Sequence, residues 1–197
     1  MRFDSATGWF DGVTRIDSPN FDARPDSPAG PCAPALIIIH GISLPPGEYG
    51  GDAVAALFTN RLDPSAHPYF AEIAHLKVST HLFLRRSGEI VQFVSLFDRA
   101  WHAGESAFEG RPACNDFSVG IEVEGTDEDP YAPAQFDRLV ELTAAVMQAL
   151  DIPDPERVVG HVDVAPQRKT DPGPNFAWGP FRAALAERVR ASGDWLA

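Results

Sequence analysis

The sequence predicts a single α/β domain in which a mixed central β-sheet is flanked by helices and joined by long ordered loops. The chain has 197 residues, of which 44% are hydrophobic and 22% charged. One domain with a substantial core therefore accounts for residues 1–197. Short β-branched runs and helical patterns intermix without strict strand–helix–strand alternation, which favours a mixed sheet. The 18 prolines cluster in three stretches and indicate the long loops.

The strands are predicted from short hydrophobic runs. Residues 36–39 form a mostly β-branched run that ends at His40 and is typical of a buried central strand. Residues 78–84 and 90–94 are predicted to pair as a β-hairpin, because Ser-Gly in the segment between them signals a turn. Residues 157–160 form another short run, which ends at His161.

Helices are predicted over residues 52–59, 133–150 and 180–191. The second of these begins at a proline, which suits the first turn of a helix, and carries one apolar stripe. Residues 1–35 are polar, rich in proline and weakly patterned. They are therefore expected to form an N-terminal arm that packs on the domain.

Charge and cysteine content exclude several classes of protein. A formal net charge of −12 repels phosphate backbones and anionic lipids, so neither nucleic acid nor a membrane is an expected partner. No apolar run approaches the ~20 residues that span a bilayer, and residues 1–10 lack a secretory signal pattern. Cys32 and Cys114 are expected to be reduced thiols, with one disulfide as the alternative. These features predict a cytoplasmic protein.

Two histidines share a context that suits a metal site. His40 and His161 each follow a short buried strand, where a rigid sheet presents side chains to a pocket. Asp171, in a loop with Pro172 and Gly173, would complete a His/His/Asp set, and hydrolytic zinc sites use three protein ligands. The alternative is that both histidines cap loops and that Asp171 forms a turn. Spacing alone does not decide between these interpretations.

Glu122 is the strongest candidate for proton transfer. In residues 118–124 the apolar side chains alternate with Gly120, Glu122 and Glu124, which share the other face. A carboxylate in a central strand is rare unless it is paired or functional, and Gly120 would leave room for a ligand beside it. The alternative is an edge strand with both glutamates in solvent.

Three further residues are candidates with simpler alternatives. The pair Trp101-His102 could form the floor of a sugar-binding groove or could merely close the core. Lys169, two residues before Asp171, could stabilise an oxyanion or could be an ordinary solvated charge. Sequence spacing leaves these alternatives open.

The chain resembles the AmpD-type N-acetylmuramoyl-L-alanine amidases in several motifs that occur in the same order. The resemblance extends from about Ser18 to Phe181. The matching segments are His40-Gly41-Ile42-Ser43-Leu44-Pro45-Pro46-Gly47-Glu48-Tyr49-Gly50-Gly51, His67-Pro68-Tyr69-Phe70, Arg99-Ala100-Trp101-His102-Ala103-Gly104, Cys114-Asn115-Asp116-Phe117-Ser118-Val119-Gly120-Ile121-Glu122 and Arg168-Lys169-Thr170-Asp171-Pro172-Gly173-Pro174.

This resemblance implies a zinc enzyme that cleaves the lactyl–L-alanine amide of anhydro-muramyl peptides during peptidoglycan recycling. The protein is expected to be a monomer. It places one Zn²⁺ on His40, His161 and Asp171. Glu122 becomes the general base and Lys169 the oxyanion-stabilising residue. The implied substrate-binding residues are Trp101, His102, Lys77 and Arg168, which face a muropeptide.

The chain departs from the family at three positions. Gly41 follows the first metal histidine, where the family often has asparagine. Lys77 stands in place of an expected arginine, and it loses the bidentate fork that binds carboxylates. Ala113 occupies a position that can carry a second arginine. These changes leave the implied catalytic set intact but alter the expected contacts with the peptide.

Two other functions remain as alternatives. A non-catalytic peptidoglycan-recognition module of the same fold commonly lacks a zinc ligand or the glutamate, whereas this chain retains all five functional positions. An exported cell-wall amidase would need a signal or another release route. The amidase of recycled fragments is therefore the predicted function.

Overall fold

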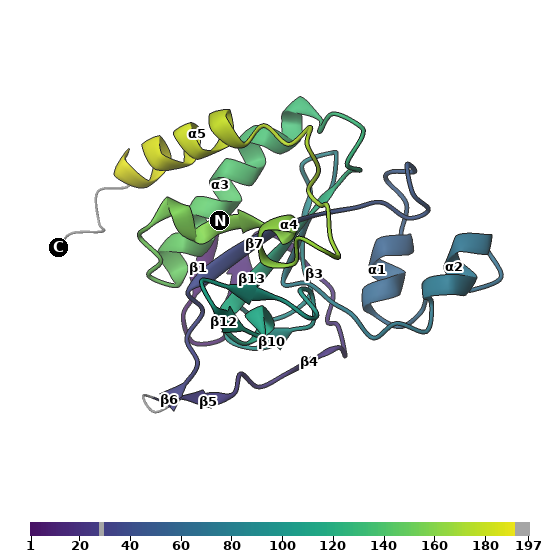
Figure 1. Cartoon of the computed structure of the whole chain (residues 1–197), viewed down its shortest axis with the longest axis horizontal. Helices are drawn as coiled ribbons and strands as arrows, with labels where there is room; N and C mark the ends of the chain where they lie inside the picture. Colours follow the sequence, from purple (N-terminus) through teal and green to yellow (C-terminus); the bar gives the residue numbers. More distant parts are fainter. Residues whose placement is uncertain (28–29, 192–197) are drawn as a thin grey trace.

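A six-stranded mixed β-sheet forms the centre of the computed structural model, which describes residues 1–27 and 30–191 (Figure 1). The strand order is β14–β7–β13–β8–β9–β3. The first four strands of this order are parallel, β9 is antiparallel to β8, and β3 is parallel to β9. The strands span Thr14–Arg15 (β3), Leu36–Ile42 (β7), Leu82–Leu84 (β8), Ile90–Gln92 (β9), Ser118–Glu124 (β13) and Val158–Gly160 (β14). The predicted mixed sheet and the hairpin are confirmed.

Three of the helices were predicted from the sequence. They are α1 (Ala53–Phe58), α3 (Pro133–Ala149) and α5 (Trp178–Ala191), and only the start of α5 differs by two residues from the expectation. Helices α2 (Pro68–Ile73) and α4 (His161–Val164) were not predicted. The residues of α2 form no apolar stripe like that of α1, since Phe70 is its one buried residue, and the four residues of α4 are too few to show a helical period. Two short 3₁₀ helices, η1 and η2, span Cys114–Phe117 and Pro155–Arg157.

The sheet is covered on both faces. Helices α3 and α5 pack over one face, where the alternate side chains of β7 and β13 join the main hydrophobic core (Figure 1). The opposite face buries Leu36 and Ile38 against η1 and α4, and α1 and α2 stand to one side of it. Burial on both faces explains the continuous hydrophobic run of β7.

The N-terminal arm is more structured than its sequence predicts. Strand β3 belongs to the central sheet, and β4 pairs with β10 beside the candidate site. Polar side chains with partners elsewhere in the fold hold this arm, so its order does not show as a hydrophobic pattern. The remaining short strands are β1 (Arg2–Asp4), β2 (Trp9–Asp11), β4 (Phe21–Asp22), β5 (Asp26–Ser27), β6 (Gly30–Pro31), β10 (Arg99–Ala100), β11 (Ala107–Phe108) and β12 (Arg111–Pro112).

Two further observations bear on the sequence predictions. Cys32 and Cys114 are both free and buried, as expected for reduced thiols. Across residues 1–27 and 30–191, no helix combines the length and the hydrophobicity that crossing a bilayer requires.

Candidate active site

Strand register brings His40, Glu122 and His161 together. The sequence suggested that the strand ends at His40. Strand β7 instead continues to Ile42, so His40 lies inside the strand. His40 pairs with Glu122 on the adjacent parallel strand, which puts both side chains on one face of the sheet. His161 directly follows the last residue of β14, the strand on the other side of β7, and is the first residue of α4. The carboxyl ends of parallel strands are where α/β folds place ligands.

Three ligand atoms from His40, His161 and Asp171 form a tight triangle. The Nδ1 atoms of the two histidines are 2.9 Å apart, and Oδ2 of Asp171 lies 3.1 Å from His161 Nδ1 and 3.2 Å from His40 Nδ1. These are the three residues that could hold a metal ion in the described chain. Ligands of tetrahedral zinc at their usual bond lengths stand about 3.3 Å apart, so the spacing suits such an ion.

The protonation of the two imidazoles also favours a cation. Nε2 of His161 lies 3.1 Å from the Ala103 carbonyl oxygen, which can only accept, so Nε2 carries a proton and Nδ1 is the nitrogen left to bind a cation. Burial lowers the pKa of His40 to about 4, so His40 is neutral at pH 7. Lone pairs and a carboxylate therefore converge on one point.

Glu122 is a buried carboxyl group that faces this triangle without a hydrogen-bond partner of its own. Its strand is central, between β7 and β8, so the edge-strand interpretation is wrong. Within the described chain, the Oε2 atom is buried and makes no hydrogen bond. Burial, and then the charge of Asp171, raise the pKa of Glu122 to about 8. A buried polar atom without a partner at a cleft is a candidate for reaction with a ligand.

Replacing Glu122 by glutamine should change how the stability of the metal-free protein depends on pH. The pKa of Glu122 is raised on folding from 4.5 to about 8, so the folded state holds its proton more tightly than the unfolded state. Its stabilising contribution is therefore complete below about pH 4.5 and is lost as pH rises to about 8. The melting temperature of Glu122→Gln should accordingly rise relative to that of the parent between pH 5 and pH 9. Thermal unfolding with a chelator present tests this, and an unchanged difference would contradict it.

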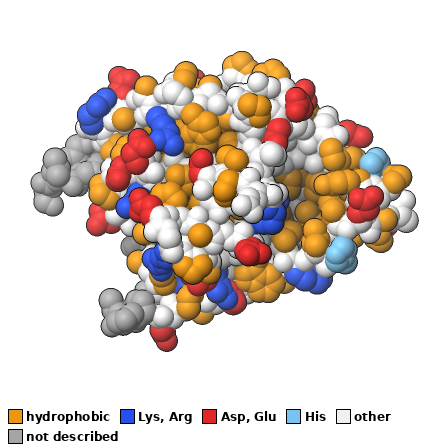
Figure 2. Space-filling view, in the orientation of Figure 1, with side chains coloured by type: hydrophobic (Ala, Val, Ile, Leu, Met, Phe, Trp, Pro, Cys, Tyr) orange, Lys and Arg blue, Asp and Glu red, His pale blue; other side chains and the backbone are white. Residues whose placement is uncertain are grey.

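The triangle and Glu122 open onto one cleft of about 580 Å³. Figure 2 shows the hollow beside α1 and α2, where hydrophobic side chains gather. One wall of the cleft is polar and contains the metal triangle, whereas the wall beside α1 and α2 is largely apolar. The residues of the apolar wall include Leu44, Leu57, Phe58, Tyr69, Ile73 and Val78. The cleft can therefore hold a ligand that has both polar and hydrophobic parts.

The structure brings most of the other predicted residues to this cleft. Trp101, His102, Arg168 and Lys169 all line it. The ammonium of Lys169 makes no hydrogen bond or ion pair among the described residues. Nη2 of Arg168 donates to the carbonyl oxygens of Ala103 and Glu105, so part of this guanidinium supports a loop. Lys77 is exposed and is not among the residues that line the cleft.

His102 lies differently from the sequence expectation. A Cβ atom on Gly120 would stand 2.6 Å from the His102 ring, so this ring fills the space that Gly120 was expected to leave for a ligand. Both ring nitrogens bond within the protein, Nδ1 to His40 and Nε2 to Ser118. Burial holds the pKa of His102 well below its usual value, and the ring is neutral.

Sequence reasoning missed two groups that support the site. His81, which the sequence does not single out, is fully buried, and its Nδ1 accepts from the Gly120 amide. Asn115 accepts two backbone N–H bonds from the loop of His102. The Cys-Asn-Asp motif was the available signal, but its role depends on contacts that no local pattern reveals.

The side chain of Tyr131 occupies the space beside residue 41, which is why glycine fits there. A Cβ atom on Gly41 would lie 2.7 Å from the Tyr131 hydroxyl oxygen, and one on Gly125 would lie 2.5 Å from the ring. The hydroxyl donates to the carbonyl oxygen of Pro172, the residue after Asp171, over 2.8 Å. Tyr131 therefore passes between two glycines and holds the loop that carries the third ligand.

Replacing Gly41 by asparagine should destabilise the protein by about 1–3 kcal/mol, because the added atoms overpack this site. Tyr131→Phe removes the hydroxyl group that the new side chain meets. The double variant should therefore lose less stability than the sum of the two single variants. Urea denaturation of all four proteins in a chelator measures this coupling, and strictly additive losses would rule out the steric explanation.

Comparisons with known proteins identify the family. A family model described as N-acetylmuramoyl-L-alanine amidase matches residues 30–174. The chain is 52% identical over 183 residues to 1,6-anhydro-N-acetylmuramyl-L-alanine amidase AmpD of Escherichia coli, covering 92% of this chain and 97% of that protein. A crystal structure of a selenomethionine AmpD derivative superimposes with a TM-score of 0.88 and 50% identity, covering 94% of this chain and 99% of that one.

A more distant structure contains a ligand. It is the amidase AmiD of E. coli in complex with the substrate anhydro-N-acetylmuramic acid-L-Ala-D-gamma-Glu-L-Lys, with a TM-score of 0.58 and 28% identity. The alignment covers 84% of this chain and 65% of that chain. The family match spans most of the sequence, and the relatives share half of their residues with it. The chain therefore belongs to the N-acetylmuramoyl-L-alanine amidase family, among its AmpD-type members.

Proposed function

We propose that this protein hydrolyses the amide bond between the lactyl group of 1,6-anhydro-N-acetylmuramic acid and L-alanine in recycled peptidoglycan fragments. The observation that carries the proposal is the triangle of His40, His161 and Asp171 with the buried carboxyl group of Glu122 in the same cleft. The names of the AmpD relatives and the ligand of AmiD support this choice of substrate.

One Zn²⁺ is the proposed cofactor, held by His40, His161 and Asp171. Two imidazole nitrogens and one carboxylate oxygen suit zinc and leave a position for water or substrate. When bound, the ion supplies a Lewis acid that lowers the pKa of water and polarises a carbonyl group.

Glu122 is the proposed general base and then general acid. Its carboxylate takes a proton from the water that attacks the carbonyl carbon. As the carbon–nitrogen bond breaks, Glu122 delivers that proton to the leaving nitrogen of L-alanine. The products are a lactyl carboxylate and a peptide with a free amino group. The raised pKa of Glu122 in the metal-free site suits a group that both accepts and donates a proton near neutral pH.

Lys169 and the residues around the cleft complete the proposed site. The positive charge of Lys169 acts on the Glu122 carboxyl group, so its ammonium lies within electrostatic reach of the reacting centre. It would stabilise the oxyanion of the tetrahedral intermediate. Arg168 and Trp101, which line the cleft, are proposed substrate contacts, whereas Lys77 has no such support.

We further propose that the enzyme acts in the cytoplasm as a monomer. Two free thiols suit a reducing compartment, and all proposed functional side chains come from one chain. A cytoplasmic enzyme meets peptidoglycan as imported fragments, which agrees with a recycling role.

The deciding experiment incubates the zinc-loaded protein with anhydro-muramyl tripeptide and identifies the products by mass. Release of the intact tripeptide and anhydro-muramic acid is expected. Zinc binding without any cleavage would instead indicate a peptidoglycan-recognition module. A parallel incubation with intact sacculi separates the recycling enzyme from a cell-wall amidase, because preferential cleavage of sacculi would overturn the recycling role.

A further inference from the structure

We propose that His102 is a positioning residue that holds His40 in the single tautomer able to present Nδ1 to the metal. This inference rests on the proposed metal site but not on the identity of the substrate. It begins with a pair of neighbouring residues. Nδ1 of His102 lies 2.9 Å from Nε2 of His40, and the carbonyl oxygen of Ala103 lies 3.1 Å from Nε2 of His161. His102 thus contacts Nε2 of His40 and Ala103 contacts Nε2 of His161, in each case the ring nitrogen that lies outside the metal triangle.

The direction of the hydrogen bonds follows from one carbonyl group. The hydroxyl of Ser118 lies 2.6 Å from the Cys114 carbonyl oxygen, and a carbonyl can only accept, so Ser118 donates its proton there. Ser118 Oγ must then accept from Nε2 of His102, which is 3.2 Å away. A His102 ring with one proton therefore carries it on Nε2, and its Nδ1 is an acceptor.

The same chain of donors reaches the metal site. Since His102 Nδ1 accepts, Nε2 of His40 donates to it, and the proton of neutral His40 lies on Nε2. The lone pair of His40 therefore lies on Nδ1, the atom in the triangle with His161 and Asp171. The protein thus sets the tautomer of His40 without a metal ion. The Ala103 carbonyl group sets that of His161 in the same way, by accepting from its Nε2.

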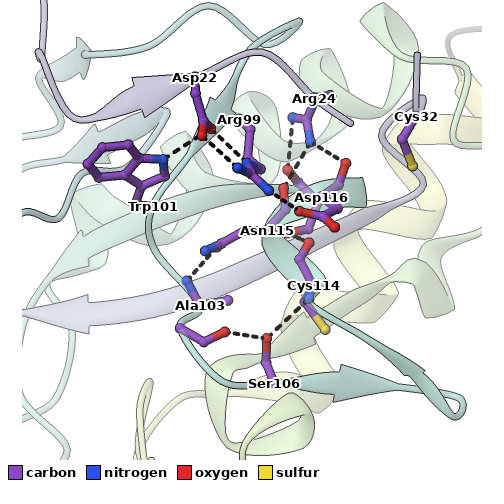
Figure 3. Close-up of polar contacts among 12 residues, drawn as sticks. Asp22, Arg24, Cys32, Arg99, Trp101, Ala103, Ser106, Cys114, Asn115 and Asp116 are labelled. Carbon is purple, nitrogen blue, oxygen red and sulfur yellow. Dashed lines mark hydrogen bonds and ion pairs between the residues drawn. The ribbon is translucent and has the colours of Figure 1, made fainter. Parts of the chain in front are cut away.

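Residues behind the loop hold His102 in place. Oδ1 of Asn115 accepts from the amides of His102 and Ala103 at 3.2 and 2.8 Å. Figure 3 shows the hydrogen bond between Asn115 and Ala103, with Arg24 and Arg99 gathered around the adjoining Asp116.

Charged side chains fix the segment that carries Asn115. Arg24 donates to the carbonyl oxygens of Asn115 and Asp116, each at 3.1 Å. Arg99 bridges Asp116 and Asp22, and Asp22 also accepts from the Trp101 indole (Figure 3). The loop of residues 101–103 is therefore tied to a network that includes the N-terminal arm.

Two substitutions separate positioning from a merely structural role. His102→Leu removes the acceptor, whereas the side-chain oxygen of His102→Asn can still accept from His40. Partners that orient a metal ligand are typically worth 10- to 100-fold in metal affinity. We therefore expect His102→Leu to bind Zn²⁺ about 10- to 100-fold more weakly, measured by competition with a zinc-binding dye. His102→Asn should recover most of this loss.

A matched control removes a histidine elsewhere. His67 caps α2 by accepting from the Tyr69 amide, so His67→Leu should lower stability and leave zinc affinity unchanged. At saturating Zn²⁺, His102→Leu should lower kcat more than it changes KM. Unchanged zinc affinity in a folded His102→Leu protein would overturn the proposal.

¹⁵N NMR of the unsubstituted protein gives a test that does not depend on whether any variant folds. Long-range ¹H–¹⁵N spectra of the metal-free and zinc-loaded protein should show the protons of His40 and His102 on Nε2. A proton on Nδ1 of His102 would overturn the proposal. Because zinc affinity and tautomers are read without substrate, they remain informative if the protein cleaves no muropeptide. A failed amidase assay therefore stays distinct from a failed positioning role.

Discussion

Replacing Asp171 by alanine should lower zinc affinity and amide hydrolysis by more than about 100-fold. A residue that only orients a ligand is worth 10- to 100-fold in affinity, and Asp171 supplies the ligand atom itself and the negative charge of the triangle. Without it, two neutral imidazoles remain, and they hold a divalent cation far less tightly. Dye competition for Zn²⁺ and turnover of anhydro-muramyl tripeptide at a fixed free zinc concentration measure the two effects.

Asp127 provides the matched control for this experiment. It also lines the cleft but is not one of the three residues that could hold the ion. Asp127→Ala should therefore bind zinc as the parent does. If Asp171→Ala retains one zinc per chain and near-parent turnover, the His/His/Asp assignment is wrong.

Replacing Glu122 by alanine should leave zinc bound and reduce turnover by a factor on the order of 100 or more. Loss of a general acid–base residue typically costs 10²- to 10⁴-fold, and Glu122 contributes no atom to the metal triangle. Glu122→Gln keeps the volume of the side chain and should show the same loss, which would assign the effect to proton transfer. Zinc content and the rate constant are measured on the same preparations.

The pH dependence adds a second criterion for Glu122. A general base must be ionised to accept a proton, so the parent rate should fall as pH drops through the pKa of Glu122 in the loaded enzyme. The residual rate of Glu122→Gln should lack this acidic limb. Near-parent turnover in Glu122→Ala, or an unchanged pH profile in Glu122→Gln, would remove Glu122 from the proposed mechanism.

The sequence predicted the elements that carry strong local periodicity. The alternation in residues 118–124 placed Glu122 and Gly120 on one face, and the structure confirms this pattern in β13. The long amphipathic helix from Pro133 was also found, because 17 residues give a clear 3.6-residue period. The short helix that begins at His161 left no such signal.

Sequence reasoning was less successful where a role depends on residues far apart in the chain. Glu122 could equally have stood on an edge strand, since the order of strands is not written in their alternation. No local pattern singles out His81, although its Nδ1 accepts from the amide of Gly120 beneath the site. Gly120 was expected to admit a ligand, yet the ring of His102 occupies that space.

The amino-acid sequence by itself determined the fold class, the hydrophobic faces of the long elements and the candidate residues His40, His161, Asp171 and Glu122. These follow from side-chain chemistry and from periodicities that act over neighbouring residues. Only the tertiary structure decided that ligand atoms of His40, His161 and Asp171 lie within 3.2 Å of one another, that Glu122 lines the same cleft, and that His102 stands behind His40. The reason is that parallel strand register joins segments more than 80 residues apart in the chain (residue 40 with residue 122), and no local interaction specifies that pairing.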